Sequence, residues 1–337
     1  MKVDSGMMGT SDLSQVGASA RALEAQGYDG LVSAEIDSDP FLPLVLAAEH
    51  TQKIELMTSI AVAFARNPMT LAQVGNDLQA FSKGRFILGL GSQIKPHITK
   101  RFSMPWSSPA ARMRELVLAM RAIWDCWYAG KKLDFRGDFY THTLMTPMFV
   151  PRNNPYGAPR VVVAAVGPKM TEVVGEVADG MLAHAFTTAR YLREVTHPAL
   201  ARGLSRAGRA RSEIEICYPA FIVTGRDERE WEAARIATAR QIGFYGSTPA
   251  YRGVLEVHGW GPLQDELNRL SKRGEWQAMG ERIGDDVLSE FAIVAEPAKV
   301  ASALKARFGG LVDRVLCTFS FVPEAERAAY IEELRAG

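Results

Sequence analysis

Cysteine is scarce in this sequence, and long hydrophobic runs are missing. The three cysteines, Cys126, Cys217 and Cys317, are far apart and lie in apolar segments. Neither a disulfide framework nor a CxxC metal site can be built from them. No segment approaches the roughly 18 consecutive apolar residues of a membrane span. The first residues, 1–4, contain no apolar signal core. We therefore expect a soluble protein of the reducing cytoplasm, without a metal centre.

Net charge is also nearly absent. The 39 basic and 38 acidic residues leave a formal net charge of +1, and no sustained basic run occurs. Binding to nucleic acid or to an anionic membrane surface generally needs a concentration of basic residues. We therefore expect neither nucleic acid nor a membrane as a partner, and a small-molecule substrate becomes the natural ligand.

Strand patterns alternate with helical patterns along the chain, and no change in composition marks a linker. Eight strands are expected, at residues 3–8, 28–34, 54–60, 85–90, 160–165, 180–184, 213–224 and 313–319. All but the last are followed by helix, which predicts an α/β fold of the (β/α)8 TIM-barrel type. A doubly wound open sheet is the alternative, but no early GxGxxG follows the first strand.

We expect a single domain over residues 1–337 that departs from a plain barrel in two places. A hairpin-like excursion is predicted at residues 133–140, with its turn at Arg136 and Gly137. A largely helical insertion at about 245–290 is predicted to precede the last strand.

Two neighbouring strand ends are the most informative part of the chain. In the segment 56–68, a strand pattern and a loop are followed by Asn67 and Pro68, which are typical of a helix cap and a first helical position. Gly84 ends that helix, and the next strand pattern leads into a second loop. Because small residues such as Ser59 and Gly91 follow the two strands, we expect open backbone surfaces at their carboxyl ends, where β/α folds bind ligands.

Taken in order, four segments resemble the bacterial-luciferase-like superfamily, and within it the coenzyme F420-dependent oxidoreductases of actinobacteria. The resemblance extends over nearly the full chain. Each segment alone is a weak signal, but their order and spacing together are specific. The segments are Ala34-Glu35, Met57-Thr58-Ser59-Ile60 with Arg66-Asn67-Pro68, Gly84 to Ser92, and Ala164 to Met170 leading to Ala178-Asp179-Gly180.

This resemblance implies a pocket for a flat ring cofactor, coenzyme F420, with FMN as the alternative. In the deazaflavin-dependent relatives a non-prolyl cis peptide bulges against the ring, and here that bond corresponds to Ser59-Ile60. Val62 stands where some relatives carry a hydroxyl side chain. The positions that correspond to cofactor contacts are Ser59, Ile60, Val62, Leu90, Gly91, Ser92, Val166, Gly167, Lys169 and Met170.

Both cofactors carry a phosphate, and the segment 166–170 has the pattern of a phosphate site. It lies between an expected strand and an expected helix, so free amides of the first helical turn can face an anion, assisted by the helix dipole. Gly167 allows a close approach of the backbone. An ordinary turn with Pro168 at the first helical position is the alternative.

Acid–base residues are less clearly indicated. Relatives commonly hold a histidine just past strand two, where this chain has Glu35-Ile36-Asp37-Ser38-Asp39. Glu35 and His97 are the catalytic candidates. The alternatives are that Glu35 orients the barrel mouth and that His97 is a solvated loop residue. Trp106, His184 and Tyr245 are the expected substrate contacts.

Three functions are compatible with these residues. The first is a hydride transfer between coenzyme F420 and a small organic substrate. Oxidation of glucose 6-phosphate is not expected, because Ser92-Gln93 stand where relatives with that activity carry a glutamate. The second function is an FMN-dependent monooxygenase. The third is a redox-inactive barrel that acts as a cofactor-free enzyme or binding protein, suggested by the missing histidine. A homodimer is the expected assembly.

Overall fold

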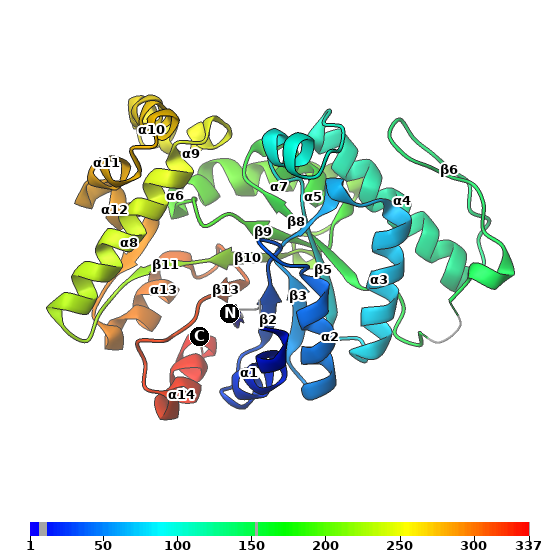
Figure 1. Cartoon of the computed structure of the whole chain (residues 1–337), viewed down its shortest axis with the longest axis horizontal. Helices are drawn as coiled ribbons and strands as arrows, with labels where there is room; N and C mark the ends of the chain where they lie inside the picture. The colour runs from blue at the N-terminus through cyan, green and yellow to red at the C-terminus, as the bar shows by residue number, and fades with distance from the viewer. Residues whose placement is uncertain (7–11, 152–153, 337) are drawn as a thin grey trace.

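Eight parallel strands close into a barrel in the computed structural model, which describes residues 1–6, 12–151 and 154–336. Pairing of β3 with β5 and of β1 with β13 completes the ring (Figure 1). The predicted (β/α)8 barrel is therefore confirmed. In order around the barrel the strands are β1 (Lys2–Gly6), β2 (Gly30–Ser33), β3 (Glu55–Thr58), β5 (Phe86–Gly91), β8 (Arg160–Ala165), β9 (Gly180–Ala183), β10 (Glu215–Pro219) and β13 (Arg314–Leu316).

Helices surround the strands, and local sequence signals fix several of their ends. At the start of α3 the Asn67 side chain accepts hydrogen bonds from the amides of Met69 and Thr70, with Pro68 in the first helical position, as predicted. Gly84, at φ +86°, follows the end of that helix. The barrel helices are α1 (Leu13–Ala25), α2 (Phe41–His50), α3 (Pro68–Phe81), α4 (Pro109–Ala129), α5 (Pro168–Val177), α7 (His197–Ala207), α13 (Val300–Phe308) and α14 (Glu324–Arg335).

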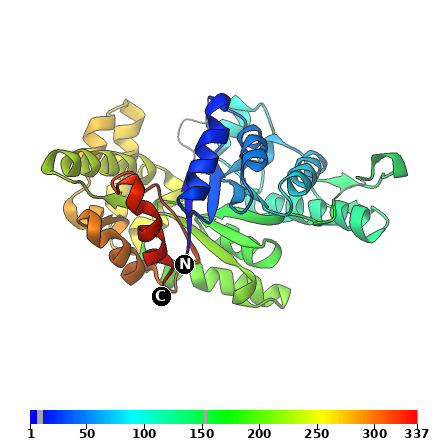
Figure 2. The same cartoon turned by 90° about the horizontal axis from the view of Figure 1, so that it is seen from below.

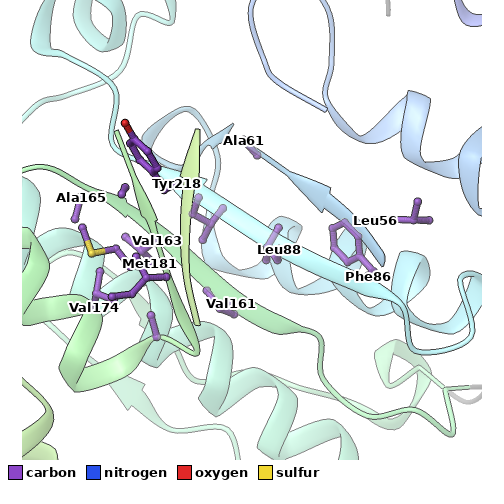
Figure 3. Packing of buried hydrophobic residues seen from close by; sticks show 14 of the residues in the cluster. Leu56, Ala61, Phe86, Leu88, Val161, Val163, Ala165, Val174, Met181 and Tyr218 are labelled. Carbon is purple, nitrogen blue, oxygen red and sulfur yellow. The ribbon is translucent and has the colours of Figure 1, made fainter. Parts of the chain in front are cut away.

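Alternate strand residues build two separate apolar layers. Side chains such as Leu88, Val161 and Val163 face outward and pack beneath the helices (Figure 3). The side chains between them fill the barrel interior in a smaller cluster, made of Val32, Met57, Ile87, Val162, Leu182 and Cys217. The middle of the barrel is thus a packed core, so a ligand site has to lie at one of its ends.

Charged side chains close the amino-terminal end of the barrel. Arg314 is fully buried and donates to both carboxylate oxygens of Asp4, at 2.8 and 2.6 Å. Glu55 and Glu215 also contact Arg314. Burial alone would raise the pKa of Glu55, but Arg314, Arg160 and Lys2 outweigh it and hold that pKa below its ordinary value. This neutralised network leaves the carboxyl-terminal end as the open mouth.

The expected insertion before the last strand is present, and it has its own small core. Its helices begin at Glu228, ahead of the predicted 245, because Asp227 caps α8 and α8 packs within the insertion. Figure 1 shows these helices on one side of the barrel. The elements are β11 (Phe221–Val223), α8 (Glu228–Gly246), α9 (Arg252–Glu256), α10 (Gly261–Arg273), α11 (Trp276–Glu281), α12 (Asp285–Phe291) and β12 (Ala292–Val294).

Several strand boundaries differ from the expected ones. The predicted strand 213–224 is divided into β10 and β11, because β10 ends at Pro219, which has no amide hydrogen for the ladder, and β11 pairs instead with β12. The last barrel strand is shorter than expected. The first strand was expected to reach Met8, and positions 7 and 8 lie outside the described residues.

A hairpin projects from the barrel after α4, on the side away from the insertion (Figures 1 and 2). Its strands are β6 (Phe135–Arg136) and β7 (Thr141–His142), so the turn follows Arg136 as predicted but extends to Tyr140. The Glu115 carboxylate accepts hydrogen bonds from the amides of Asp138, Phe139 and Tyr140, which fixes the turn against α4. Within the described residues, no helix is long and apolar enough to cross a membrane.

Candidate functional site

The chain bulges at the carboxyl end of β3, at the barrel mouth. The peptide bond between Ser59 and Ile60 is cis, as the family resemblance implied. The Ser59 amide still donates to the carbonyl of Ser33 at 2.7 Å, and beyond the bulge the short strand β4 (Ala61–Val62) pairs with the end of β5. The bulge is therefore held on both sides by neighbouring strands.

Two glycines of β5 make room for this bulge. A Cβ atom on Gly89 would lie 1.7 Å from the carbonyl oxygen of Thr58, so only glycine fits there. The Thr58 hydroxyl links the two strands here: it donates to the carbonyl of Gly89 at 2.7 Å and accepts from the amide of Gly89 at 2.8 Å. Ile60 lies over Gly91, where a Cβ would come within 2.8 Å of its side chain.

Glu35, the first catalytic candidate, holds the bulge from the side of β2. Its amide donates to the carbonyl of Ile60 at 3.1 Å. Its carboxylate oxygen Oε2 accepts from the amide of Val62 at 2.7 Å and from Arg66 at 2.6 Å. The side chain is only 8% exposed. Arg66 also bonds to Asp39 and lies over the ring of Phe41, so it joins the loops after β2 and β3.

The amino terminus of α5 is the expected phosphate site, and it is open. Gly167 precedes the helix without a side-chain cap, and no acidic residue lies in the first turn. The amides of Lys169 and Met170 have no acceptor among the residues that the structure describes. A Cβ on Gly167 would meet nothing within 4 Å. Free amides, open space and the helix dipole together suit an anion.

His184 follows the end of β9, next to β8, and faces aromatic rings from the insertion. Its ring centroid lies 4.6 Å from that of Tyr245 and 4.7 Å from that of Tyr251. Nδ1 accepts a hydrogen bond from the amide of Phe186 at 3.0 Å. Burial lowers the pKa of His184 to about 4. His184 also lines a small cavity of about 10 Å³ together with Val166.

The loop after β5 brings Trp106 and His97 into different surroundings. The Trp106 ring packs edge-on against Phe64, with centroids 5.8 Å apart, beside the bulge. Arg112 supports this contact, because it lies over the Phe64 ring and donates to the carbonyl of Pro105 at 2.6 Å. His97 begins a single π-helical turn, and it is exposed. Its imidazole makes no hydrogen bond with the described residues.

The remaining predicted cofactor contacts divide by their burial. Ser59, Ile60, Ser92, Val166 and Met170 are partly accessible, and Lys169 is exposed. Val62 and Leu90 are fully buried in the outer core, so neither side chain is accessible from the mouth.

Three residues without a predicted role also organise the site: Thr58, Arg66 and Tyr251. Thr58 and Arg66 stand within the segments that carry the family resemblance, which was the available signal. For Tyr251 the sequence carried only a weak signal, because its contact with His184 joins residues far apart in the chain.

Sequence comparison relates this chain to one protein family. Residues 1–314 match the family model described as luciferase-like monooxygenase. An uncharacterised protein of Mycobacterium tuberculosis is 57% identical over 325 residues, 96% of each chain. A 5,10-methylenetetrahydromethanopterin reductase of Archaeoglobus fulgidus is 25% identical and covers 85% of this chain and 82% of its own. A protein of M. tuberculosis described as a putative coenzyme F420-dependent oxidoreductase is 29% identical, with 82% of each chain covered.

Solved structures support the fold. The coenzyme F420-dependent tetrahydromethanopterin reductase of Methanopyrus kandleri superimposes with a TM-score of 0.78 at 20% identity, over 99% of this chain and 97% of that one. The oxygenating component of 3,6-diketocamphane monooxygenase from Pseudomonas putida, in complex with FMN, gives a TM-score of 0.63 at 16% identity, over 99% and 96% of the chains. One barrel type therefore accommodates proteins described with either cofactor.

Proposed function

The chain belongs to the luciferase-like monooxygenase family, and on that premise we propose that it is an oxidoreductase that transfers a hydride between coenzyme F420 and a small organic substrate. The relatives support F420 over FMN. The putative F420-dependent oxidoreductase of M. tuberculosis covers most of the chain, whereas the FMN-bound neighbour shares only the fold.

One structural observation carries the proposal: the uncapped start of α5 opens on the same end of the barrel as the Ile60 bulge. The amides of Lys169 and Met170 would hold the cofactor phosphate, and the charge of Lys169 would strengthen that attraction. Ile60 and Gly91 would support one face of the ring. When bound, the deazaflavin supplies a carbon that gives or accepts a hydride.

The residues around this pocket act by binding and orientation. Glu35 is a positioning residue in this scheme, because Val62 and Arg66 both engage Oε2 of its carboxylate. Trp106 packs on Phe64, and Tyr245 and Tyr251 pack on His184; in this scheme these rings would provide apolar walls that limit water near the reacting atoms.

The phosphate assignment is tested by Gly167→Asp, with Gly167→Asn as the neutral control of nearly the same size. Because a Cβ at this position meets nothing within 4 Å, both variants are expected to fold with little change in thermal stability. A carboxylate beside the phosphate is expected to lower F420 affinity roughly ten- to hundredfold, whereas the amide lowers it much less. Equal affinities of the two folded variants in fluorescence titrations would remove the phosphate from this site.

A further inference from the structure

The fold holds the neutral imidazole of His184 in one tautomer. Nδ1 accepts the amide hydrogen of Phe186, two residues further along the chain, at 3.0 Å. A ring nitrogen that accepts a hydrogen bond carries no proton itself, so in the neutral ring the proton is on Nε2. The Nε2–H group is therefore a hydrogen-bond donor.

The surroundings of the ring favour the neutral form. Tyr245 of α8 packs edge-on against it, and Tyr251, just ahead of α9, packs at a tilt of 45°. These two phenols are the titratable groups in contact with the ring, and desolvation alone lowers the pKa of His184 to about 4. No charged side chain is set against the imidazole within the described part of the chain.

The Nε2 atom remains available to a ligand. It makes no hydrogen bond with the described residues, and His184 is partly accessible. Its position after β9 places it at the carboxyl-terminal end of the barrel strands, next to Val166, with which it lines a small cavity of about 10 Å³.

We propose that His184 binds an uncharged oxygen of the substrate through its Nε2–H group, so that the substrate class is a ketone, an aldehyde or an alcohol with apolar substituents. The inference rests on the proposed hydride transfer. When a hydride adds to a carbonyl carbon, the π electron pair of the C–O bond moves onto the oxygen, which then takes a proton from solvent. A neutral imidazole donor aimed at that oxygen stabilises the developing charge without becoming charged itself.

The aromatic walls set the rest of the specificity. Tyr245, Tyr251 and Phe186 form a continuous set of rings beside the donor, since Phe186 and Tyr251 are stacked with centroids 6.1 Å apart. Apolar substituents would pack on these rings, whereas a carboxylate or phosphate on the substrate would find no cation next to His184. Charged sugar phosphates are therefore excluded from this part of the site.

The test uses cyclohexanone and methylenecyclohexane, which have the same shape and differ in whether an oxygen accepts a hydrogen bond. Binding is measured by ligand-observed NMR in wild type, His184→Phe and His184→Gln, first without cofactor and then with F420. We expect wild type to prefer the ketone by about three- to tenfold. The preference is lost in His184→Phe, which keeps an aromatic ring, and partly restored in His184→Gln, whose amide can donate.

Equal binding of the two probes by wild type, or an unchanged preference in folded His184→Phe, would overturn the role of His184. Nitrogen-15 chemical shifts of the histidines give a second readout: an imidazolium at position 184 at pH 7 would also overturn it. Failure of F420 to bind wild type would instead remove the proposed function, because the probe preference is measured without cofactor as well.

Discussion

Arg66 donates a hydrogen bond to Oε2 of Glu35 at 2.6 Å, and this contact joins the loop after β2 to the loop after β3. The same oxygen accepts the amide of Val62, just past the Ile60 bulge. One carboxylate thus holds both the guanidinium and the strand that continues from the bulge, so its shape matters more than its ability to exchange a proton.

Replacing Glu35 separates positioning from proton transfer. Glu35→Ala leaves the Val62 amide and Arg66 without their acceptor, and we expect a loss of about 1–3 kcal/mol in the free energy of unfolding, with weaker F420 binding. Glu35→Gln retains an oxygen acceptor, so its F420 affinity should stay within about threefold of wild type. Urea unfolding and fluorescence titration measure both quantities. Full stability in Glu35→Ala would argue against the positioning role.

Gly89 and Gly91 should respond differently to the same substitution. In Gly89→Ala the new methyl group would meet the Thr58 carbonyl at 1.7 Å, so the backbone has to move, and we expect a loss of about 3 kcal/mol or more. In Gly91→Ala it meets side-chain rather than backbone atoms, namely those of Ile60 at 2.8 Å. That variant should lose about 1 kcal/mol but bind F420 less tightly, because Ile60 is displaced. Similar thermal unfolding of the two variants would contradict this view of the bulge.

The sequence was sufficient to predict features that depend on neighbouring residues. Asn67 and Pro68 specify the start of α3 by local hydrogen bonding and backbone geometry, and the alternation of strand and helix patterns indicated a barrel. The end of β10 at Pro219 also has a local cause, because proline lacks an amide hydrogen. The strand was nevertheless predicted to continue, because the pattern of apolar residues extends past Pro219.

Contacts between distant residues were not predictable in this way. Arg66 and Glu35 are 31 positions apart, and Arg314 and Asp4 are 310 apart, so no local pattern pairs them. The burial of the Val62 side chain depends on the direction in which the chain leaves the bulge. The position of Tyr251 against His184 depends on how the insertion packs on the barrel.

His184 predicts a specific dependence of stability on pH. Its folded pKa of about 4 is below the unfolded value of 6.5, so the unfolded chain binds the proton more readily. Above pH 6.5 the residue adds no pH dependence, and stability falls as the pH falls from about 6.5 to about 4. Between pH 7.5 and pH 5, we expect wild type to lose about 2 kcal/mol more than His184→Phe. Parallel losses in urea unfolding of the two proteins would show that His184 is not kept neutral by the fold.

The most direct measurement is a pair of equilibrium titrations of the purified protein, one with coenzyme F420 and one with FMN. Both ligands carry a flat ring and a phosphate, so each tests the same open region between the Ile60 bulge and the start of α5. We expect F420 to bind at least about tenfold more tightly than FMN, a difference of about 1.4 kcal/mol. A preference for FMN, or no binding of either ligand by folded protein, would contradict the assignment.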